Sequence, residues 1–281
     1  MKQIPFFVIA LLISGCDSVP TTKSQPSPPV ITQPVISQPE IESSPTDNPK
    51  QALVIGNSEY EYSPLVNPTS DAGDMAAKLR QMGFAVTFKT NLDYQTMDIA
   101  IHDFGKRLLD TQAKDSVGLF YFAGHGARSS SDNYLLPINN RNIKNESDLQ
   151  QNALHAKIVL ARMEEVNKGM NIIILDACRD NPYSGVRTLS RGLTRMPPPV
   201  GALIAFATEE GKTAADSDDS AGRNGLYTKH LLAALEGAEH KRIEDVFMAV
   251  QSPVVDKSDG KQEPWYQASF RKPFCFGGCS Q

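Results

Sequence analysis

The sequence predicts an α/β domain with a mostly parallel central sheet and helices on both of its faces. Two observations support this prediction. Short runs that are almost entirely apolar alternate with helical patterns along the chain, and two of these runs end in a glycine-containing turn. Strands buried on both faces are apolar throughout, and alternation of strands with helices is typical of parallel sheets.

The expected elements follow one another in chain order. Strands are predicted over residues 51–55, 84–88, 117–122, 171–175 and 202–207, and helices over residues 70–79, 99–109, 158–166 and 226–235. Ser70 is expected to cap the first helix, and Gly83 to stop it. A last helix carries Ile243, Val246, Phe247 and Val250 on one face, and Pro253 is expected to end it near Ser252.

Residues 1–15 have the pattern of an export signal. Lys2 precedes an apolar run over residues 4–13, which is too short to cross a bilayer but suits a signal peptide. The run ends in Ile-Ser-Gly-Cys, which resembles the lipobox of bacterial lipoproteins. The resemblance implies that Cys16 is lipidated and becomes the mature N-terminus. The alternative is an ordinary signal peptide with a chance cysteine.

Residues 16–50 are rich in Pro, Ser and Thr and are expected to form a disordered tether rather than a packed structure. We therefore expect a domain over residues 51–281, anchored by lipid to a bacterial cell membrane and facing the periplasm or the cell exterior. A ligand for proline-binding modules is the alternative interpretation of this stretch. The formal net charge of −4 and the lack of a basic stripe argue against a nucleic-acid partner.

Two chemically active residues directly follow predicted strands. His125 lies in the sequence Gly-His-Gly after the strand over residues 117–122, and Cys178 follows Asp176 and Ala177 at the end of another strand. Both are expected at the carboxyl edge of the sheet, where ligands of α/β proteins bind. An imidazole can take the proton of a thiol and later protonate a leaving amine. Either residue taken alone is also compatible with a structural role.

The pair and its surroundings resemble the bacterial caspase-like cysteine peptidases, which are related to paracaspases and metacaspases. His125 lies 53 residues before Cys178, close to the spacing of about 50 found in caspases. The similarity extends over residues 52–57, 67–79, 120–126, 134–137, 175–182, 205–211 and 262–265. It implies a caspase-like fold and peptide-bond hydrolysis through an acyl-enzyme. Cys178 would be the nucleophile, His125 the general acid and base, and the amides of Gly126 and Cys178 the oxyanion hole.

The resemblance also bears on specificity. Caspases that cut after Asp have Gln where this chain has Asp176, whereas the matching acid of paracaspases and metacaspases helps to bind Arg or Lys. Asp71 and Asp216 match further acids of that pocket, so substrates with Arg or Lys at the cleavage site are expected. Asp71 could instead serve only as a carboxylate in the first turn of a helix, and Asp216 could lie on a solvated loop.

The residues after Cys178 differ from those of metacaspases, and two cysteines near the C-terminus form a separate motif. Metacaspases have His-Ser-Gly after the nucleophile, but here residues 179–181 are Arg-Asp-Asn, so calcium dependence is not indicated and no cofactor or metal is expected. Cys275 and Cys279 flank two glycines and could form a disulfide in an oxidising compartment.

The stretch 183–199 is rich in glycine and proline and joins two predicted strands. Its Arg187, Arg191 and Arg195 are candidate sites of self-cleavage, since the corresponding region of caspase-like enzymes is often cut. The alternative is that they are solvated charges on a loop.

Two other functions fit these residues less well than a peptidase does. A non-catalytic caspase-fold scaffold would need neither the His125–Cys178 pair nor an acidic pocket. A cysteine phosphatase needs Arg at a fixed spacing after its nucleophile, and the corresponding position is Ser184.

Overall fold

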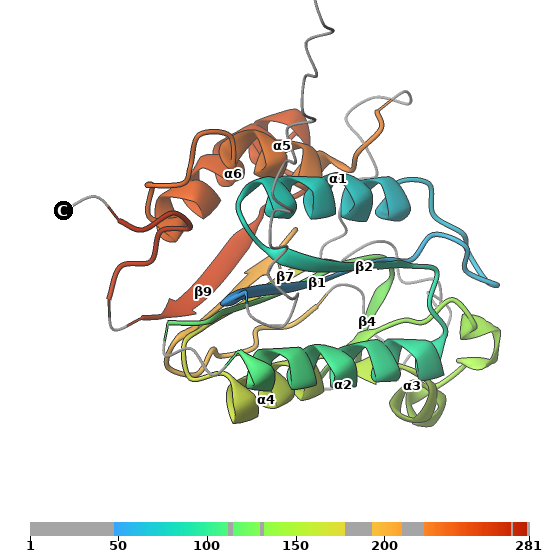
Figure 1. Cartoon of the computed structure of the whole chain (residues 1–281). Helices are drawn as coiled ribbons and strands as arrows, with labels where there is room; N and C mark the ends of the chain where they lie inside the picture. Colours follow the sequence, from blue (N-terminus) through green and yellow to red (C-terminus); the bar gives the residue numbers. More distant parts are fainter. Residues whose placement is uncertain are drawn as a thin grey trace, which may run out of the picture. The chain divides into compact units, whose positions relative to one another are not determined.

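The structure is a computed structural model and describes residues 48–111, 115–129, 132–177, 193–209, 222–270 and 272–279. In this part of the chain a six-stranded sheet has the order β2-β1-β3-β7-β8-β9 (Figure 1). Its strands are β1 (Lys50–Gly56), β2 (Ala85–Thr90), β3 (Val117–Ala123), β7 (Met170–Asp176), β8 (Ala202–Phe206) and β9 (Trp265–Ser269). The five predicted strands are confirmed and pair in parallel, whereas β9 joins the edge antiparallel to β8.

Helices cover both faces of this sheet, as Figure 1 shows. One face carries α1 (Pro68–Gln81), α5 (Leu226–Ala234) and α6 (Ile243–Lys257), and the other carries α2 (Tyr94–Asp110) and α4 (Ala156–Val166). Successive β1 side chains alternate between the two cores: Val54 packs with the first set of helices and Leu53 with the second. The predicted α/β class is therefore confirmed.

A smaller sheet lies beside the carboxyl edge of the main one and was not predicted. It has the order β4-β5-β6, with β4 (Gly126–Ser129), β5 (Asp132–Leu135) and β6 (Leu154–His155). The short helices η1 (Asn140–Asn142) and α3 (Glu146–Asn152) connect β5 to β6. Strands this short give no clear sequence pattern, yet β4 begins one residue after His125.

Three predicted helix boundaries were wrong. The α1 helix begins at Pro68 rather than after Ser70, since proline suits the first turn of a helix. The α2 helix begins at Tyr94, because Asp93 caps it by accepting a hydrogen bond from the Thr96 amide. The α6 helix continues through Pro253 to Lys257, and burial of Val254 on the same face as Val250 offsets the hydrogen bond lost at proline.

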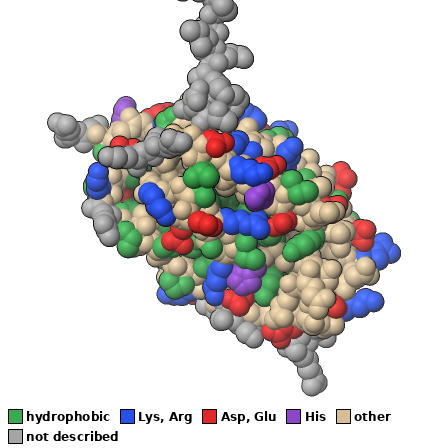
Figure 2. All heavy atoms as spheres, turned by 60° about the horizontal axis from the view of Figure 1, so that its bottom comes forward, with side chains coloured by type: hydrophobic (Ala, Val, Ile, Leu, Met, Phe, Trp, Pro, Cys, Tyr) green, Lys and Arg blue, Asp and Glu red, His purple; other side chains and the backbone are tan. Residues whose placement is uncertain are grey.

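The helices α2 and α4 form a surface of mixed charge. Figure 2 shows basic and acidic side chains interspersed over this face, and Arg162 of α4 pairs with Asp98 of α2 at 2.8 Å. Within the described residues, no helix combines the length and the apolar character needed to span a membrane.

Candidate active site

His125 lies immediately beyond the end of β3, at the carboxyl edge of the sheet. Its side chain is 1% exposed. The neighbouring strand β7 ends level with β3, since Ala123 pairs with Asp176 and the Gly124 amide donates to the Asp176 carbonyl at 3.1 Å. The prediction that His125 follows a strand at this edge is confirmed.

The turn that carries His125 packs directly against the residue before Cys178. A side chain on Gly126 would place its Cβ 2.2 Å from the Ala177 carbonyl oxygen, so only glycine allows this approach. Cys178 itself lies outside the described residues. Its attachment to Ala177 nevertheless makes it the next residue of the segment that contacts Gly126.

The Gly126 amide is directed away from β5. Leu136 donates its amide hydrogen to the His125 carbonyl at 2.9 Å, which makes His125 and Leu136 a hydrogen-bonded pair of the antiparallel ladder. The next pair, Gly126 and Leu135, is then of the non-hydrogen-bonded kind, in which the amides point away from the partner strand. The ladder between β4 and β5 therefore does not use this amide.

A loop after β1 fixes the orientation of the His125 ring. The Ser63 carbonyl lies 2.7 Å from Nε2 of His125. Because a carbonyl oxygen can only accept, Nε2 carries a hydrogen in this contact, and in the neutral ring the basic nitrogen is Nδ1. This loop therefore selects the tautomer that can take a proton at Nδ1.

Tyr60 contacts the same turn through its hydroxyl group and its ring. Its Oη accepts the His125 amide hydrogen at 2.8 Å and donates to the Leu136 carbonyl at 3.3 Å. The Tyr60 and His125 rings are 4.5 Å apart. A Cβ on Gly124 would lie 2.4 Å from this hydroxyl, so the glycine before the histidine is also needed for close packing.

Asn140 holds the loop that contains Ser63. Its buried amide accepts from the Tyr62 backbone N–H and donates to the Tyr62 carbonyl, each at 2.9 Å. Ser63 itself has a φ of 61°, in the left-handed region that non-glycine residues seldom adopt. The clamp on Tyr62 thus holds in place the unusual backbone that presents the Ser63 carbonyl to His125.

Two of the predicted pocket acids each bind a residue near the start of α5. Asp71 of α1 is fully buried and accepts from the Gly225 amide at 2.8 Å, and Asp176 is 1% exposed and accepts from the Thr228 hydroxyl at 2.8 Å. The first turn of a helix stabilises negative charge, which offsets part of the cost of burying these carboxylates. The structure therefore places both carboxylates against the first turn of α5, and Asp176 is also two residues before Cys178.

Asp74 lies one turn after Asp71 on α1 and faces outward. It forms a bidentate pair with Arg223, at 2.8 and 2.9 Å, and accepts from Asn224 at 3.0 Å. The hydrogen bond from Arg223 lowers the pKa of the Asp74 carboxyl below its usual value. Asp71 and Asp74 of α1 thus both bind the chain that leads into α5.

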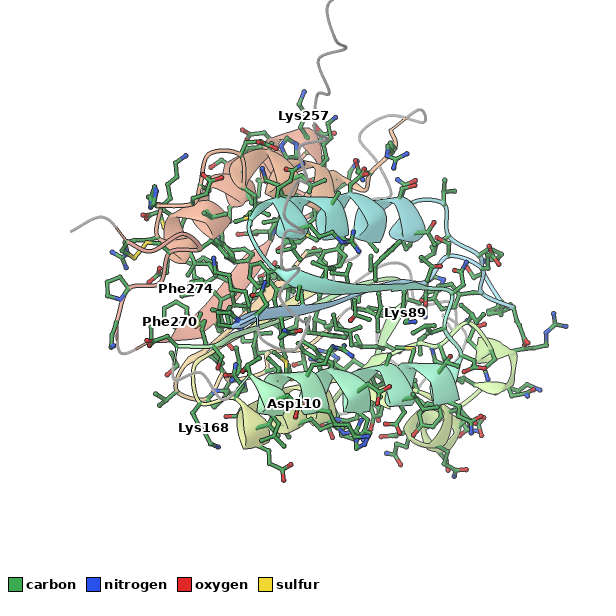
Figure 3. The ribbon with its side chains drawn as sticks, in the orientation of Figure 1. Lys89, Asp110, Lys168, Lys257, Phe270 and Phe274 are labelled. Atoms are coloured by element: carbon green, nitrogen blue, oxygen red, sulfur yellow. A yellow bond between two sulfur atoms is a disulfide. The ribbon has the colours of Figure 1, made fainter. Side chains whose placement is uncertain are left out.

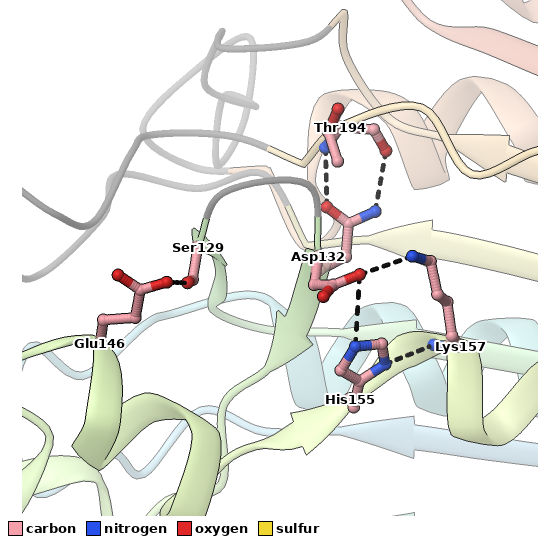
Figure 4. Close-up of polar contacts among 7 residues, drawn as sticks. Ser129, Asp132, Glu146, His155, Lys157 and Thr194 are labelled. Atoms are coloured by element: carbon pink, nitrogen blue, oxygen red, sulfur yellow. Dashed lines mark hydrogen bonds and ion pairs between the residues drawn. The ribbon is translucent and has the colours of Figure 1, made fainter.

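The segment from Leu193 to Pro199, which contains Arg195, is attached to the β4–β5 hairpin. Asn133 accepts from the Thr194 amide at 2.7 Å and donates to the Thr194 carbonyl at 2.8 Å (Figure 4). Leu193 and Met196 are buried, and the Arg195 guanidinium lies 5.4 Å from the centre of the Trp265 ring.

The other predicted site residues fall into two groups. Cys275 and Cys279 are joined in a disulfide, which confirms that prediction. Outside the described residues lie Cys16, Cys178, Arg187, Arg191 and Asp216. Within the described ranges, no three His, Cys, Asp or Glu side chains lie close enough together to hold a metal ion.

Comparison with known proteins identifies relatives over most of this domain. The family model for the caspase domain matches residues 49–275. The chain is 30% identical to mucosa-associated lymphoid tissue lymphoma translocation protein 1 of Homo sapiens, over 70% of this chain and 23% of that protein. It is also 30% identical to a protein of a Desulfuromonadales bacterium named as a probable protease, over 44% of this chain and 16% of that protein. The chain thus spans less than a quarter of the length of these relatives.

Proposed function

Because this chain belongs to the caspase domain family, a family of cysteine peptidases, we propose that it is an endopeptidase that cuts after Arg or Lys through Cys178 and His125. The observation that carries the proposal is the junction of β3 and β7. There a buried histidine, held by the Ser63 carbonyl, lies on the turn that packs against the residue before Cys178. The relative named as a protease supports the same class of activity.

The proposed reaction uses groups of the chain itself. Nδ1 of His125 takes the thiol proton, and the Cys178 thiolate attacks the scissile carbonyl carbon. The amides of Gly126 and Cys178 stabilise the negative charge on the carbonyl oxygen. The imidazolium then protonates the leaving amine as the C–N bond breaks, and His125 activates the water that hydrolyses the thioester. No metal or cofactor takes part in these steps.

The proposed preference for Arg or Lys rests on Asp71 and Asp176. Both carboxylates are buried beside the start of α5, and Asp176 is two residues before the nucleophile. A cationic substrate side chain would gain a charge interaction there, whereas an Asp side chain would be repelled. Asp216 is proposed as a third acid of this pocket.

The proposed setting is the surface of a bacterial membrane. In this proposal the signal peptide is removed before Cys16, lipid is attached to that residue, and the Pro-rich tether holds the peptidase domain on the periplasmic or outer side. Its substrates would be peptides or proteins that reach this compartment.

Hydrolysis of short fluorogenic peptides ending in Arg, Lys or Asp tests the proposal. The purified protein should cleave the Arg and Lys peptides, and Cys178→Ala or His125→Ala should reduce turnover by several orders of magnitude, about 10³-fold or more. His102→Ala, on the exposed side of α2, is the matched control and should leave turnover unchanged. Near-normal turnover in a folded Cys178→Ala protein would contradict the mechanism. If the wild-type protein cleaves none of the peptides, the scaffold alternative gains support.

A further inference from the structure

A large cavity opens at the edge of the central sheet opposite His125. Its volume is about 860 Å³. The first residues of three parallel strands line it, Lys50 of β1, Val117 of β3 and Met170 of β7. Since β3 is seven residues long, this edge lies roughly 20 Å from the catalytic edge. The cavity is therefore separate from the candidate active site.

The lining combines positive charge with aromatic surface. Lys50, Lys168 and Lys272 contribute three ammonium groups, and Asp115 contributes one carboxylate. Phe270 and Phe274 form part of the wall, and Figure 3 shows them next to each other on the side of the molecule where Lys168 also lies. Within the described residues, none of the three lysines is paired with a carboxylate. The cavity thus has an uncompensated positive charge beside an apolar wall.

Lys50 shows why an anion would be favoured there. Its ammonium donates to the carbonyls of Phe276 and Met82 and lies 5.9 Å from the Phe84 ring centre, so its partners are polar or aromatic but uncharged. Burial lowers the pKa of Lys50. A bound anion would supply the counter-charge that these contacts lack.

The N-terminal part of the chain joins the domain at this same edge. Asn48 is the first described residue, two positions before Lys50, and its side chain donates to the Gly83 carbonyl at 3.1 Å. The sequence indicates a tether over residues 16–50 that begins at a lipidated Cys16, and its last residues, Asn48 to Lys50, lie at this edge. This edge is the one from which the domain would be tethered to a membrane.

We propose that this cavity binds the headgroup of an acidic phospholipid. The lysines contact the phosphate, and Phe270 and Phe274 pack against the glycerol and the first acyl carbons. Cavities of this volume commonly hold small ligands with a charged end and an apolar body, and lysines near an anionic membrane surface strengthen binding. The proposal goes beyond peptidase activity and does not depend on it, because binding is measured without a peptide substrate.

Cosedimentation of the full chain with vesicles tests this site. Vesicles of phosphatidylcholine alone are compared with vesicles containing about a quarter phosphatidylglycerol. Lys168→Ala/Lys272→Ala should reduce the phosphatidylglycerol-dependent binding at low salt by about tenfold or more. The double variant Lys89→Ala/Lys257→Ala carries the same change in net charge, removes two exposed lysines far from the cavity (Figure 3), and should bind as the wild type does. All variants have the same N-terminal residues, so binding through the anchor is the same in each and cancels when the variants are compared.

Equal losses in the two double variants would overturn the proposal, since the effect would then follow net charge alone. The proposal would also be overturned if the wild-type protein bound no more strongly to vesicles with phosphatidylglycerol than to vesicles of phosphatidylcholine alone.

A second measurement distinguishes a lipid headgroup from a free phosphate. Calorimetric titration compares inorganic phosphate with dispersed short-chain phosphatidylglycerol. Phe270→Ala should weaken the lipid and leave phosphate unchanged, and Val200→Asn, which alters an exposed lining residue without disturbing the core, should do the same. Tighter binding of phosphate than of lipid, or a lipid affinity that neither variant changes, would reject the lipid assignment.

Discussion

At the residue scale, Asp176 is held by a short chain of hydroxyl groups. The Thr228 hydroxyl donates its one hydrogen to Asp176, so the Tyr121 hydroxyl, 2.6 Å from Thr228, must donate to Thr228 in turn. Both Thr228 and Tyr121 are buried. The carboxylate therefore has a fixed orientation two residues before Cys178, and fixed orientation is what the proposed specificity pocket would require.

The first prediction concerns this carboxylate. Asp176→Asn keeps the shape of the side chain but removes its charge. The kcat/KM for Arg and Lys peptides should therefore fall by an amount equivalent to about 2–4 kcal/mol, as expected for loss of a desolvated charge pair. Cleavage of peptides with uncharged residues at that position should change much less. Steady-state kinetics on a matched peptide series gives the comparison.

Asp74→Asn is the control for this prediction. It removes a carboxylate from the same surface of α1 and α5, but Asp74 faces outward and binds Arg223. Its kinetics should therefore match the wild type. A preference of the wild-type protein for Asp-ending peptides would show that the charge assigned to the pocket is wrong.

The sequence predicted the residues that lie within its motifs but not those that hold them. His125, Asp71 and Asp176 each stand in a recognisable segment; the structure places His125 at the expected edge and the two acids against the start of α5. Tyr60, Ser63, Asn140 and Thr228 were not identified. They act through contacts between residues 52 to 78 positions apart, often through backbone atoms, which leave no local pattern in a single sequence.

At the element scale, the β4–β5 hairpin is fastened on both sides. Figure 4 shows Ser129 bonded to Glu146 of α3, and Asp132 bonded to Lys157 at the start of α4. His155 lies 3.4 Å from the same Asp132 oxygen. Because β4 begins one residue after His125, these contacts help to hold the turn that carries His125. Local sequence predicts long apolar strands well, but it could not predict a sheet stabilised by such polar contacts.

The second prediction follows from Asp132. The hydrogen bond from Lys157 lowers the pKa of the Asp132 carboxyl below its usual value of about 3.9. A lowered carboxyl pKa stabilises the fold above the unfolded-state value, and this contribution is lost as the pH falls through the folded-state value. Asp132→Asn should therefore lower the melting temperature at neutral pH, and the difference should close below about pH 4.

The size of this effect is limited because Asp132 is one-third exposed. We expect at most about 1 kcal/mol at neutral pH. Asp110→Asn, at the exposed end of α2, is the control and should cause no loss. A difference between wild type and Asp132→Asn that stays constant from neutral to acid pH would contradict the assignment.

The third prediction concerns the three arginines proposed as self-cleavage sites. A peptidase needs an accessible, extended segment, but Thr194 is bonded through both backbone groups and Leu193 and Met196 are buried. Cleavage after Arg195 would require this segment to detach. We therefore expect cleavage after Arg187 or Arg191 in preference to Arg195.

Incubation of the wild type beside Cys178→Ala tests this expectation. Fragments should form in the wild type only, and N-terminal sequencing of the smaller one should begin at residue 188 or 192. Arg187→Ala/Arg191→Ala should stay intact. A fragment beginning at Met196 in the wild type would show that the segment does detach, and an intact protein that still hydrolyses peptides would show that activity needs no cut.

At the scale of the whole molecule, the two edges of the parallel sheet carry different groups. The carboxyl edge carries His125 and the proposed pocket acids, while the amino edge carries the basic cavity and Lys50, two residues after the first described residue, Asn48. If the domain is tethered at the amino edge, the catalytic edge faces away from the membrane, toward the compartment that holds the substrates. This division follows from the parallel sheet itself, because all its parallel strands begin at one edge and end at the other.

The fourth prediction tests that arrangement through its anchor. In cells, wild-type protein should sediment with membranes, and mass spectrometry should find a mature N-terminus at Cys16 that carries lipid. Cys16→Ser removes the thiol that receives the lipid, so the protein should remain an unprocessed precursor or become soluble. Cys279→Ser is the matched control, since it removes a cysteine of the C-terminal disulfide and leaves the signal intact, and it should still be lipidated. An unmodified Cys16 in mature wild-type protein would reject the lipid anchor. The basic cavity would then have to meet acidic phospholipid without a lipid anchor that holds the chain at the membrane.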